Sequence, residues 1–275
     1  MSKINFREPA QNLRAFVKLL GDLDPGKVAY SWFGGHIFGY LGNKPAQMLC
    51  GVEGFGVLRC QPMPDGKYRI MNRELAFYSH PFAGQYIDTW KNPINGADCE
   101  VSPIHNHHVA AELSPVMKMD FEGTLKEFPF TPPWTVLGDD VFQVFEVHTA
   151  YPSPMKPADW PRESPGDVCR ISEIFQRTAK LVDVEDGNRT SAHYTGVWTR
   201  VGPWLPWMQM GQLEGHILYR TFMKKLYSID ELPAQLRAAT EKRYPEFFQA
   251  PALSDWGKPN DSSWGTYMKE RKPVR

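Results

Sequence analysis

The sequence predicts a mainly β protein: an antiparallel, lipocalin-like (calycin-type) β-barrel with an N-terminal helix and a C-terminal helix plus tail. From about residue 27, segments rich in β-branched and aromatic residues follow one another, and turn signals containing Gly, Pro and Asn separate them. Many short strands at this spacing are typical of a meander that closes into a barrel or sandwich. We expect a single domain over residues 1–275, with the barrel at about 27–225.

The N-terminal helix is expected at about 8–20. Leu13, Phe16, Val17 and Leu20 fall on one helical face, and Gly21 follows as at a helix C-terminus. The periodicity then changes to that of strands.

The segment 68–78 shows the strand alternation most clearly. Asn72, Glu74 and Tyr78 share one face, and Arg73 lies on the other. A charged side chain inside a barrel is costly unless it is paired or functional. Either Glu74 and Tyr78 or Arg73 therefore face the interior, and the sequence leaves both alternatives open. Further strands are predicted at 98–112, 141–149, 193–200 and 214–223.

Two long segments are expected to be irregular. Residues 113–140 are predicted to form a crossing loop, and residues 150–168, with five prolines, a rigid connection or a lid over the barrel mouth. The capping-box match Ser228–Glu231 predicts a helix at 229–243, so helix and tail together cover about 228–275. Aromatic residues in the tail would pack on its own barrel or on a second subunit, and the latter alternative predicts a homodimer.

The run GPWLPWMQMG at 202–211 combines two tryptophans and two methionines with two prolines. Proline reduces the conformations available before folding, and methionine fills irregular apolar space. The run is either the preformed apolar wall of a pocket or a stiff crossover that closes the core.

Composition excludes several classes of function. Lys+Arg and Asp+Glu are both 31, so the net charge is zero, which argues against nucleic acid as a partner. The N-terminus has no apolar signal core and no run of 18 apolar residues occurs, so we expect a cytoplasmic protein without membrane contact. GxGxxG, P-loop and GxSxG motifs are absent, and no cofactor is predicted.

The densest polar cluster is IHNHH at 104–108. On a strand, His105 and His107 point to the same face. They could serve as general acid or base, bind a transition metal with a third ligand such as His148, or lie exposed at a strand end. Lys91 and Arg200 are further candidates as ligand anchors, next to Trp90 and Trp198.

The chain resembles the bacterial and fungal family known as domain of unknown function 1838, through GQYIDTWKNPINGADCEV (84–101) and VWTRVGPWLPWMQMGQLEGHILY (197–219). Asn106 also matches the family pattern, whereas the three histidines around it depart from it and suggest chemistry specific to this member. The chain is further similar to sphingomonad lyases that release formaldehyde from lignin-derived aromatic dimers.

This resemblance leads to a functional hypothesis: a cofactor-independent lyase that converts a phenolic aromatic dimer to a stilbene and formaldehyde. The candidate catalytic residues are His105, His107 and Tyr78 (as phenolate) for the base, and Arg73, Lys91 and Arg200 for the stabilising cation. The predicted substrate-binding residues are Trp90, Asn106, Trp198, Trp204, Trp207, Met208 and Met210. The alternatives are a lipocalin-like binding protein for an apolar metabolite, and a metal-dependent oxygenase or isomerase that uses His105 and His107.

Overall fold

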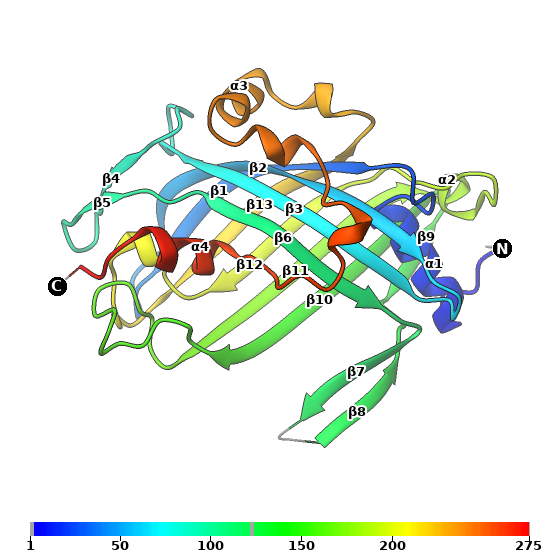
Figure 1. Ribbon diagram of the computed structural model, residues 1–275, viewed down its shortest axis with the longest axis horizontal. Helices are drawn as coiled ribbons and strands as arrows, with labels where there is room; N and C mark the ends of the chain where they lie inside the picture. The colour runs from blue at the N-terminus through cyan, green and yellow to red at the C-terminus, as the bar shows by residue number, and fades with distance from the viewer. Residues whose placement is uncertain (1–2, 122–123, 275) are drawn as a thin grey trace.

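The computed structural model describes residues 3–121 and 124–274 and is dominated by one curled antiparallel sheet (Figure 1). The sheet forms a half-barrel, and the prediction of a mainly β, antiparallel fold is confirmed. Its outer strands, β6 (Ile104–Leu113) and β9 (Trp134–Leu137), stand at opposite ends of the strand order and do not pair with each other. In sheet order the strands are β6 (Ile104–Leu113), β3 (Tyr68–Ser79), β2 (Gln47–Pro62), β1 (Ala29–Tyr40), β13 (His216–Leu226), β12 (Thr195–Gly202), β11 (Val168–Lys180), β10 (Asp140–Pro152) and β9 (Trp134–Leu137).

Helix α1 (Pro9–Leu20) packs at one end of the half-barrel, close to the N-terminus (Figure 1). The Glu8 carboxylate accepts from the first free backbone N–H groups, and Pro9 follows it at the first helical position. Leu13, Phe16 and Val17 are buried in a cluster with strand residues. The predicted helix at 8–20 is confirmed, because its apolar stripe matches the face that the sheet must cover.

The C-terminal region covers the convex side of the sheet and then returns along its edge. The predicted helix at 229–243 is interrupted: the capping box opens only the short 3-10 turn η2 (Ile229–Glu231), and α3 (Ala234–Arg243) starts after Pro233. Proline lacks the N–H that a helix interior needs, so the helix restarts after it. The remaining elements are η3 (Pro245–Phe248), η4 (Leu253–Asp255) and α4 (Ser263–Glu270).

Several expected loops contain strands. Within 113–140 the structure has β7 (Val116–Phe121), β8 (Thr124–Pro129) and β9, and the β7–β8 hairpin projects away from the half-barrel (Figure 1); residues 122–123 of this range lie outside the described residues. Residues 153–167 are irregular as expected, but β11 begins at Val168 and was not predicted.

The remaining short elements lie near the ends of the large sheet. The predicted strand 98–112 divides at Pro103 into β5 (Asp98–Glu100), which pairs with β4 (Thr89–Lys91), and β6. Helix α2 (Leu181–Glu185) follows β11, and η1 (Pro206–Met208) lies between β12 and β13. No described helix has both the length and the apolar character needed to cross a bilayer.

A β-bulge in β6 sets the direction of its side chains. Asn72 pairs with Val109 and Glu74 with Asn106, so two steps along β3 correspond to three steps along β6. The extra residue lies at His107–His108 and allows both Asn106 and Val109 to line the concave face. Bulges commonly redirect a side chain in this way beside a functional site.

Candidate functional site: a carboxylate pair in an aromatic cavity

The concave face of the half-barrel encloses a cavity of about 530 Å³. Strands β1, β3, β6 and β11 supply most of its wall, with further residues from β2, β10, β12 and β13, and residues of α1, η1 and α4 complete it. The wall is mainly apolar and aromatic; these side chains include Phe16, Phe33, Phe145, Phe175, Trp198, Trp207, Trp264 and Tyr267. Such a cavity with a small number of polar groups is typical of a site for a small organic molecule.

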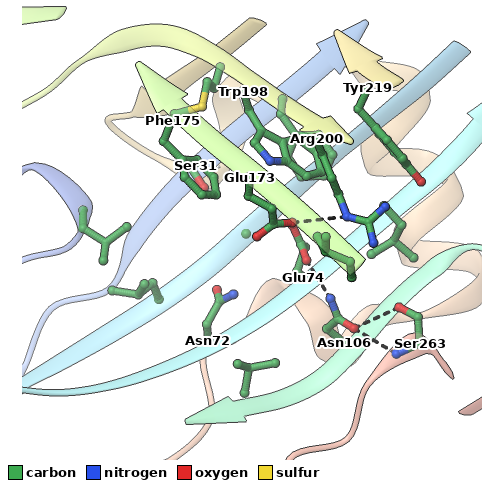
Figure 2. Close-up of a pocket in the computed structure, with 18 of the residues that line it drawn as sticks. Ser31, Asn72, Glu74, Asn106, Glu173, Phe175, Trp198, Arg200, Tyr219 and Ser263 are labelled. Atoms are coloured by element: carbon green, nitrogen blue, oxygen red, sulfur yellow. Dashed lines mark hydrogen bonds and ion pairs between the residues drawn. The ribbon is translucent and has the colours of Figure 1, made fainter. Parts of the chain in front are cut away.

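Glu74 of β3 projects into this cavity and is held by a short chain of hydrogen bonds. Asn106 Nδ2 donates to Glu74 Oε2 at 2.7 Å. The Oδ1 of Asn106 in turn accepts from both the backbone N–H and the hydroxyl of Ser263, each at 2.9 Å. Figure 2 shows the three side chains in one row from β3 to α4. Ser263 therefore fixes the orientation of the Asn106 amide, and the tail contributes to the site.

Glu173 of β11 faces Glu74 from the opposite wall, and the two carboxyl groups point toward each other (Figure 2). Arg200 Nε lies 3.3 Å from Glu173 Oε1. The pKa of Glu74 is raised to about 7. Burial is the main cause and the nearby Glu173 charge adds to it, whereas the Asn106 hydrogen bond and Arg200 oppose the rise. Burial also raises the pKa of Glu173, opposed by Arg200. A carboxyl group with a pKa of about 7 can accept or donate a proton at neutral pH.

Two buried tyrosines lie beside the carboxylate pair. The hydroxyl groups of Tyr78 and Tyr219 are 3.2 Å apart, and Tyr78 packs against Trp207 with ring centroids 4.9 Å apart. Burial, reinforced by Tyr219, raises the pKa of Tyr78 well above its usual value. This corrects the prediction of a Tyr78 phenolate base: in this environment Tyr78 is a neutral hydroxyl that can donate a hydrogen bond.

Four buried N–H donors on cavity-lining residues have no acceptor among the residues that the structure describes. They are Nε1 of Trp198, Nη1 of Arg200, Nε1 of Trp207 and Nε of Arg177. A buried donor without a partner costs free energy, so such groups are normally satisfied by water or by a ligand. The cavity therefore presents donors suited to an oxygen of a bound molecule, next to a titratable carboxyl group.

The structure places two predicted bases outside the cavity. His105 and His107 share a face, as predicted, but it is the convex one, where both rings pack against Phe247 of η3. Neither lines the cavity, which corrects their assignment as bases in it. Burial lowers the pKa of both imidazoles, as expected for side chains covered by an apolar segment.

Arg73 and Lys91 are also removed from the cavity. Arg73 points to the convex side and donates to the backbone carbonyls of His107, Glu246 and Gln249 at 3.0, 2.8 and 3.0 Å. It holds the C-terminal segment against the sheet. Lys91 is exposed on the β4–β5 hairpin and pairs with Asp98. Of the three predicted cations, only Arg200 lines the cavity.

The run 202–211 combines both of its predicted roles. Leu205, Pro206 and Trp207 line the cavity, whereas Trp204, Met208 and Met210 are buried in the core around it. Trp90 packs edge-on against Trp207, with ring centroids 5.3 Å apart, and supports it from outside the cavity. Of the predicted substrate-binding residues, Asn106, Trp198 and Trp207 therefore line the cavity, and Trp90, Trp204, Met208 and Met210 do not.

The metal-binding alternative lacks a ligand set in the part of the chain that the structure describes. No three His, Cys, Asp or Glu side chains among these residues lie close enough to hold a metal ion together. The four cysteines are buried free thiols.

Glu173 was missed by the sequence analysis because β11 was not predicted as a strand. The cavity-facing residues of β11 are every second residue of the strand: Ile171, Glu173, Phe175 and Arg177. The period of two is visible in the sequence, but charges on the inner face conceal the usual contrast between apolar and polar faces. Recognition of this strand would have required the alternation to be read without regard to polarity.

Comparison with known proteins identifies a family. The family model described as "Protein of unknown function (DUF1838)" matches residues 26–272. This confirms the resemblance predicted from the two segments at 84–101 and 197–219. No curated protein matches the chain.

Proposed function

The chain belongs to the DUF1838 family, and we propose that it is a cofactor-independent lyase that releases formaldehyde from a phenolic aromatic dimer. The observation that carries the proposal is Glu74, a carboxyl group with a pKa of about 7 in an aromatic cavity. It lies in the same small region as the acceptor-free donors of Trp198 and Arg200. A base, hydrogen-bond donors for a developing oxyanion and flat apolar walls are what this reaction requires.

The proposed reaction needs proton transfer but no external oxidant. Loss of the substrate's phenol proton to water pushes electron density toward the benzylic carbon and breaks its bond to the ether oxygen. That oxygen takes up a proton in return, and a quinone methide results. Glu74 then accepts the proton of the neighbouring hydroxymethyl group. The carbon–carbon bond to that group breaks, its electron pair forms the stilbene double bond, and the quinone methide becomes a phenolate again. A phenylcoumaran gives one formaldehyde and one stilbene that keeps the former ether oxygen as a phenol. A diarylpropane diol gives in addition one water, because its leaving oxygen is a hydroxyl group.

The polar groups around Glu74 have separate roles in this scheme. Arg200 Nη1 and Trp198 Nε1 donate to the hydroxymethyl oxygen as it loses its proton, because both lack another acceptor. Tyr78, protonated at neutral pH, donates toward the departing ether oxygen. Glu173 holds Arg200 in place at 3.3 Å and, through its negative charge, keeps the pKa of Glu74 high.

The test is turnover of a phenylcoumaran or a diarylpropane diol in the presence of a chelator, with formaldehyde and stilbene both measured. Glu74→Gln keeps the shape of the side chain but cannot accept the proton, and we expect it to reduce kcat by roughly 100-fold or more. Glu146→Gln is the matched control, since Glu146 is exposed on β10. His107→Gln tests the earlier histidine hypothesis and is expected to retain activity. Absence of formaldehyde from every such dimer, or full activity of Glu74→Gln, would exclude the proposal.

A second candidate is a lipocalin-like binding protein for an apolar metabolite. The curled sheet and its apolar cavity favour it, because neither feature requires a reaction. It predicts stoichiometric recovery of an unchanged ligand, with an affinity that Glu74→Gln leaves intact.

A cytoplasmic location and a homodimer remain predictions; light scattering of the purified protein measures the latter.

A further inference from the structure

Arg177 of β11 lines the same cavity and has an environment unusual for an arginine. The residue is only 4% exposed. No carboxylate of the described residues forms an ion pair with it, in contrast to Arg200, which pairs with Glu173. A buried charge is costly unless it is paired or hydrogen-bonded. Within the described part of the chain, this guanidinium therefore has no anionic partner.

The polar contacts of Arg177 are incomplete. Its Nη1 donates to Gln143 Oε1 at 2.7 Å, but its Nε has no acceptor. Nε2 of Gln143 has no acceptor either, although Gln143 is fully buried. Two neighbouring buried side chains thus each have an N–H group without an acceptor. One oxygen that accepts from the guanidinium would relieve part of this cost.

Aromatic rings surround the guanidinium. Its Cζ lies 5.5, 5.1 and 5.4 Å from the ring centroids of Phe16, Phe175 and Tyr194. These contacts stabilise the cation through the faces of the rings, and the Tyr194 side chain is also a hydrogen-bond partner of the guanidinium. Nε is still left without an acceptor. The rings also create an apolar setting in which a charge-assisted hydrogen bond is strong.

The strand register arranges the cavity in three successive layers. Glu173 pairs with Arg200, and Phe175, two residues further, pairs with Trp198. Arg177 follows after another two residues. Phe175 and Trp198 stack with ring centroids 6.3 Å apart and planes 8° apart. At about 3.3 Å per strand residue, Arg177 lies roughly 13 Å along β11 from Glu173. A flat aromatic layer thus separates two polar ends.

We propose that Arg177 binds the phenolate oxygen of the substrate's reacting ring, while the ring itself lies against the Phe175–Trp198 layer. The hydroxymethyl side of the substrate then reaches Glu74, Glu173 and Arg200. The inference rests on the proposed function for the identity of the reacting end. It adds the cation that holds the phenolate whose electron pair drives the reaction, a role that the sequence analysis gave to Arg73, Lys91 or Arg200.

The test uses probes that cannot react. These are trans-4-hydroxystilbene, trans-stilbene-4-carboxylate and trans-stilbene, none of which carries a hydroxymethyl group, so failure of the lyase proposal does not affect the measurement. Binding is followed by fluorescence titration at pH 8. We expect the hydroxyl probe to bind more tightly than trans-stilbene in the wild-type protein. Arg177→Met should weaken the hydroxyl probe by roughly 10- to 100-fold and leave trans-stilbene unchanged.

Arg170→Met is the matched control, because Arg170 lies on the same strand and is exposed on its other face. Its affinity for all three probes should equal that of the wild type. Where Arg177→Met does not fold, absorbance of 4-hydroxystilbene bound to the wild-type protein supplies a second measurement: the guanidinium should lower the pKa of the bound phenol. Equal affinity for the hydroxyl probe and trans-stilbene, an unshifted phenol pKa, or a gain for the carboxylate probe alone would overturn the assignment.

Discussion

Asn106 Nδ2 donates a 2.7 Å hydrogen bond to Oε2 of Glu74, and this contact joins the edge strand β6 to the titratable carboxyl group of the cavity. The amide is oriented by Ser263, which donates twice to its oxygen. The orientation of the Glu74 carboxyl group therefore depends on the C-terminal tail, more than 150 residues away in the sequence. Four predictions follow from the positions of individual side chains.

Asn106→Leu should raise the pKa of Glu74 above its value of about 7, because the Asn106 hydrogen bond stabilises the ionised form. If Glu74 acts as the base, the acidic limb of the pH profile of kcat/KM should move to higher pH by about one unit. Ser263→Ala should shift it in the same direction by less, since the backbone N–H remains. Asn260→Ala is the control. Asn260 lies in the same tail as Ser263, and its Oδ1 accepts from the backbone N–H of Ala110 in β6 and not from Asn106. If the acidic limb of the pH profile is unchanged in Asn106→Leu, the assignment of Glu74 as the base is wrong.

Glu74 should also make stability depend on pH. Its pKa rises from 4.5 to about 7 on folding, so between these values the folded protein holds a proton that the unfolded chain has lost. The stabilisation is fully present below pH 4.5 and is lost as the pH rises through about 7, by roughly 3 kcal/mol as an upper limit. Urea denaturation at pH 5 and pH 8 measures it. In Glu74→Gln, the difference in the free energy of unfolding between pH 5 and pH 8 should be smaller by this amount. If the wild type and Glu74→Gln show the same pH dependence, the pKa of Glu74 is not raised by folding.

Tyr78→Phe should remove a neutral donor without removing a base. The hydroxyl of Tyr219, 3.2 Å away, loses its partner, which should cost about 1 kcal/mol of the free energy of unfolding. We expect activity to fall roughly tenfold, with the acidic limb of the pH profile in place. Because the pKa of Tyr78 lies well above its usual value, the wild-type enzyme should show no gain in activity as the pH rises toward 9 to 10 that Tyr78→Phe abolishes. Such a gain would restore the phenolate role.

Arg73→Met should destabilise the protein without changing the reaction. The side chain donates to three backbone carbonyls, two of them in the C-terminal segment, and we expect its loss to cost roughly 2 kcal/mol. Thermal denaturation and kcat are measured on the same sample. Arg59→Met, which loses a single carbonyl contact at 3.3 Å, provides the comparison. A large fall in kcat at unchanged stability would instead indicate that Arg73 acts on the substrate.

The local part of this structure could be read from the sequence. The apolar stripe of α1, its terminating Gly21, and the alternation that places Glu74 and Tyr78 on one face of β3 are properties of neighbouring residues. Periodicity reports them directly, because a helix and a strand repeat their side-chain directions over a few residues. The shared face of His105 and His107 was correct for the same reason.

Periodicity does not determine which of two faces turns inward, and the tertiary structure decided that for β3 and β6. Arg73 and the two histidines were candidates because polar side chains on a strand suggested a cavity. The C-terminal segment, distant in sequence, covers that face instead, with Phe247 against both imidazoles. The bulge at His107–His108 then lets Asn106 and Val109 line the same concave face. These outcomes depend on which surfaces pack together, a property of the whole chain.

The amino-acid sequence by itself determined the class of fold, the family and the residue types from which a cavity could be built. Only the tertiary structure brought Glu173 opposite Glu74 and placed Arg177 in the same cavity, because both lie on a strand that its charged inner face concealed. The physical reason is that burial of a charge is acceptable only in a particular three-dimensional setting. The ion pair with Arg200 reduces the cost of burying the Glu173 carboxylate. That pair forms only when β11 and β12 lie side by side.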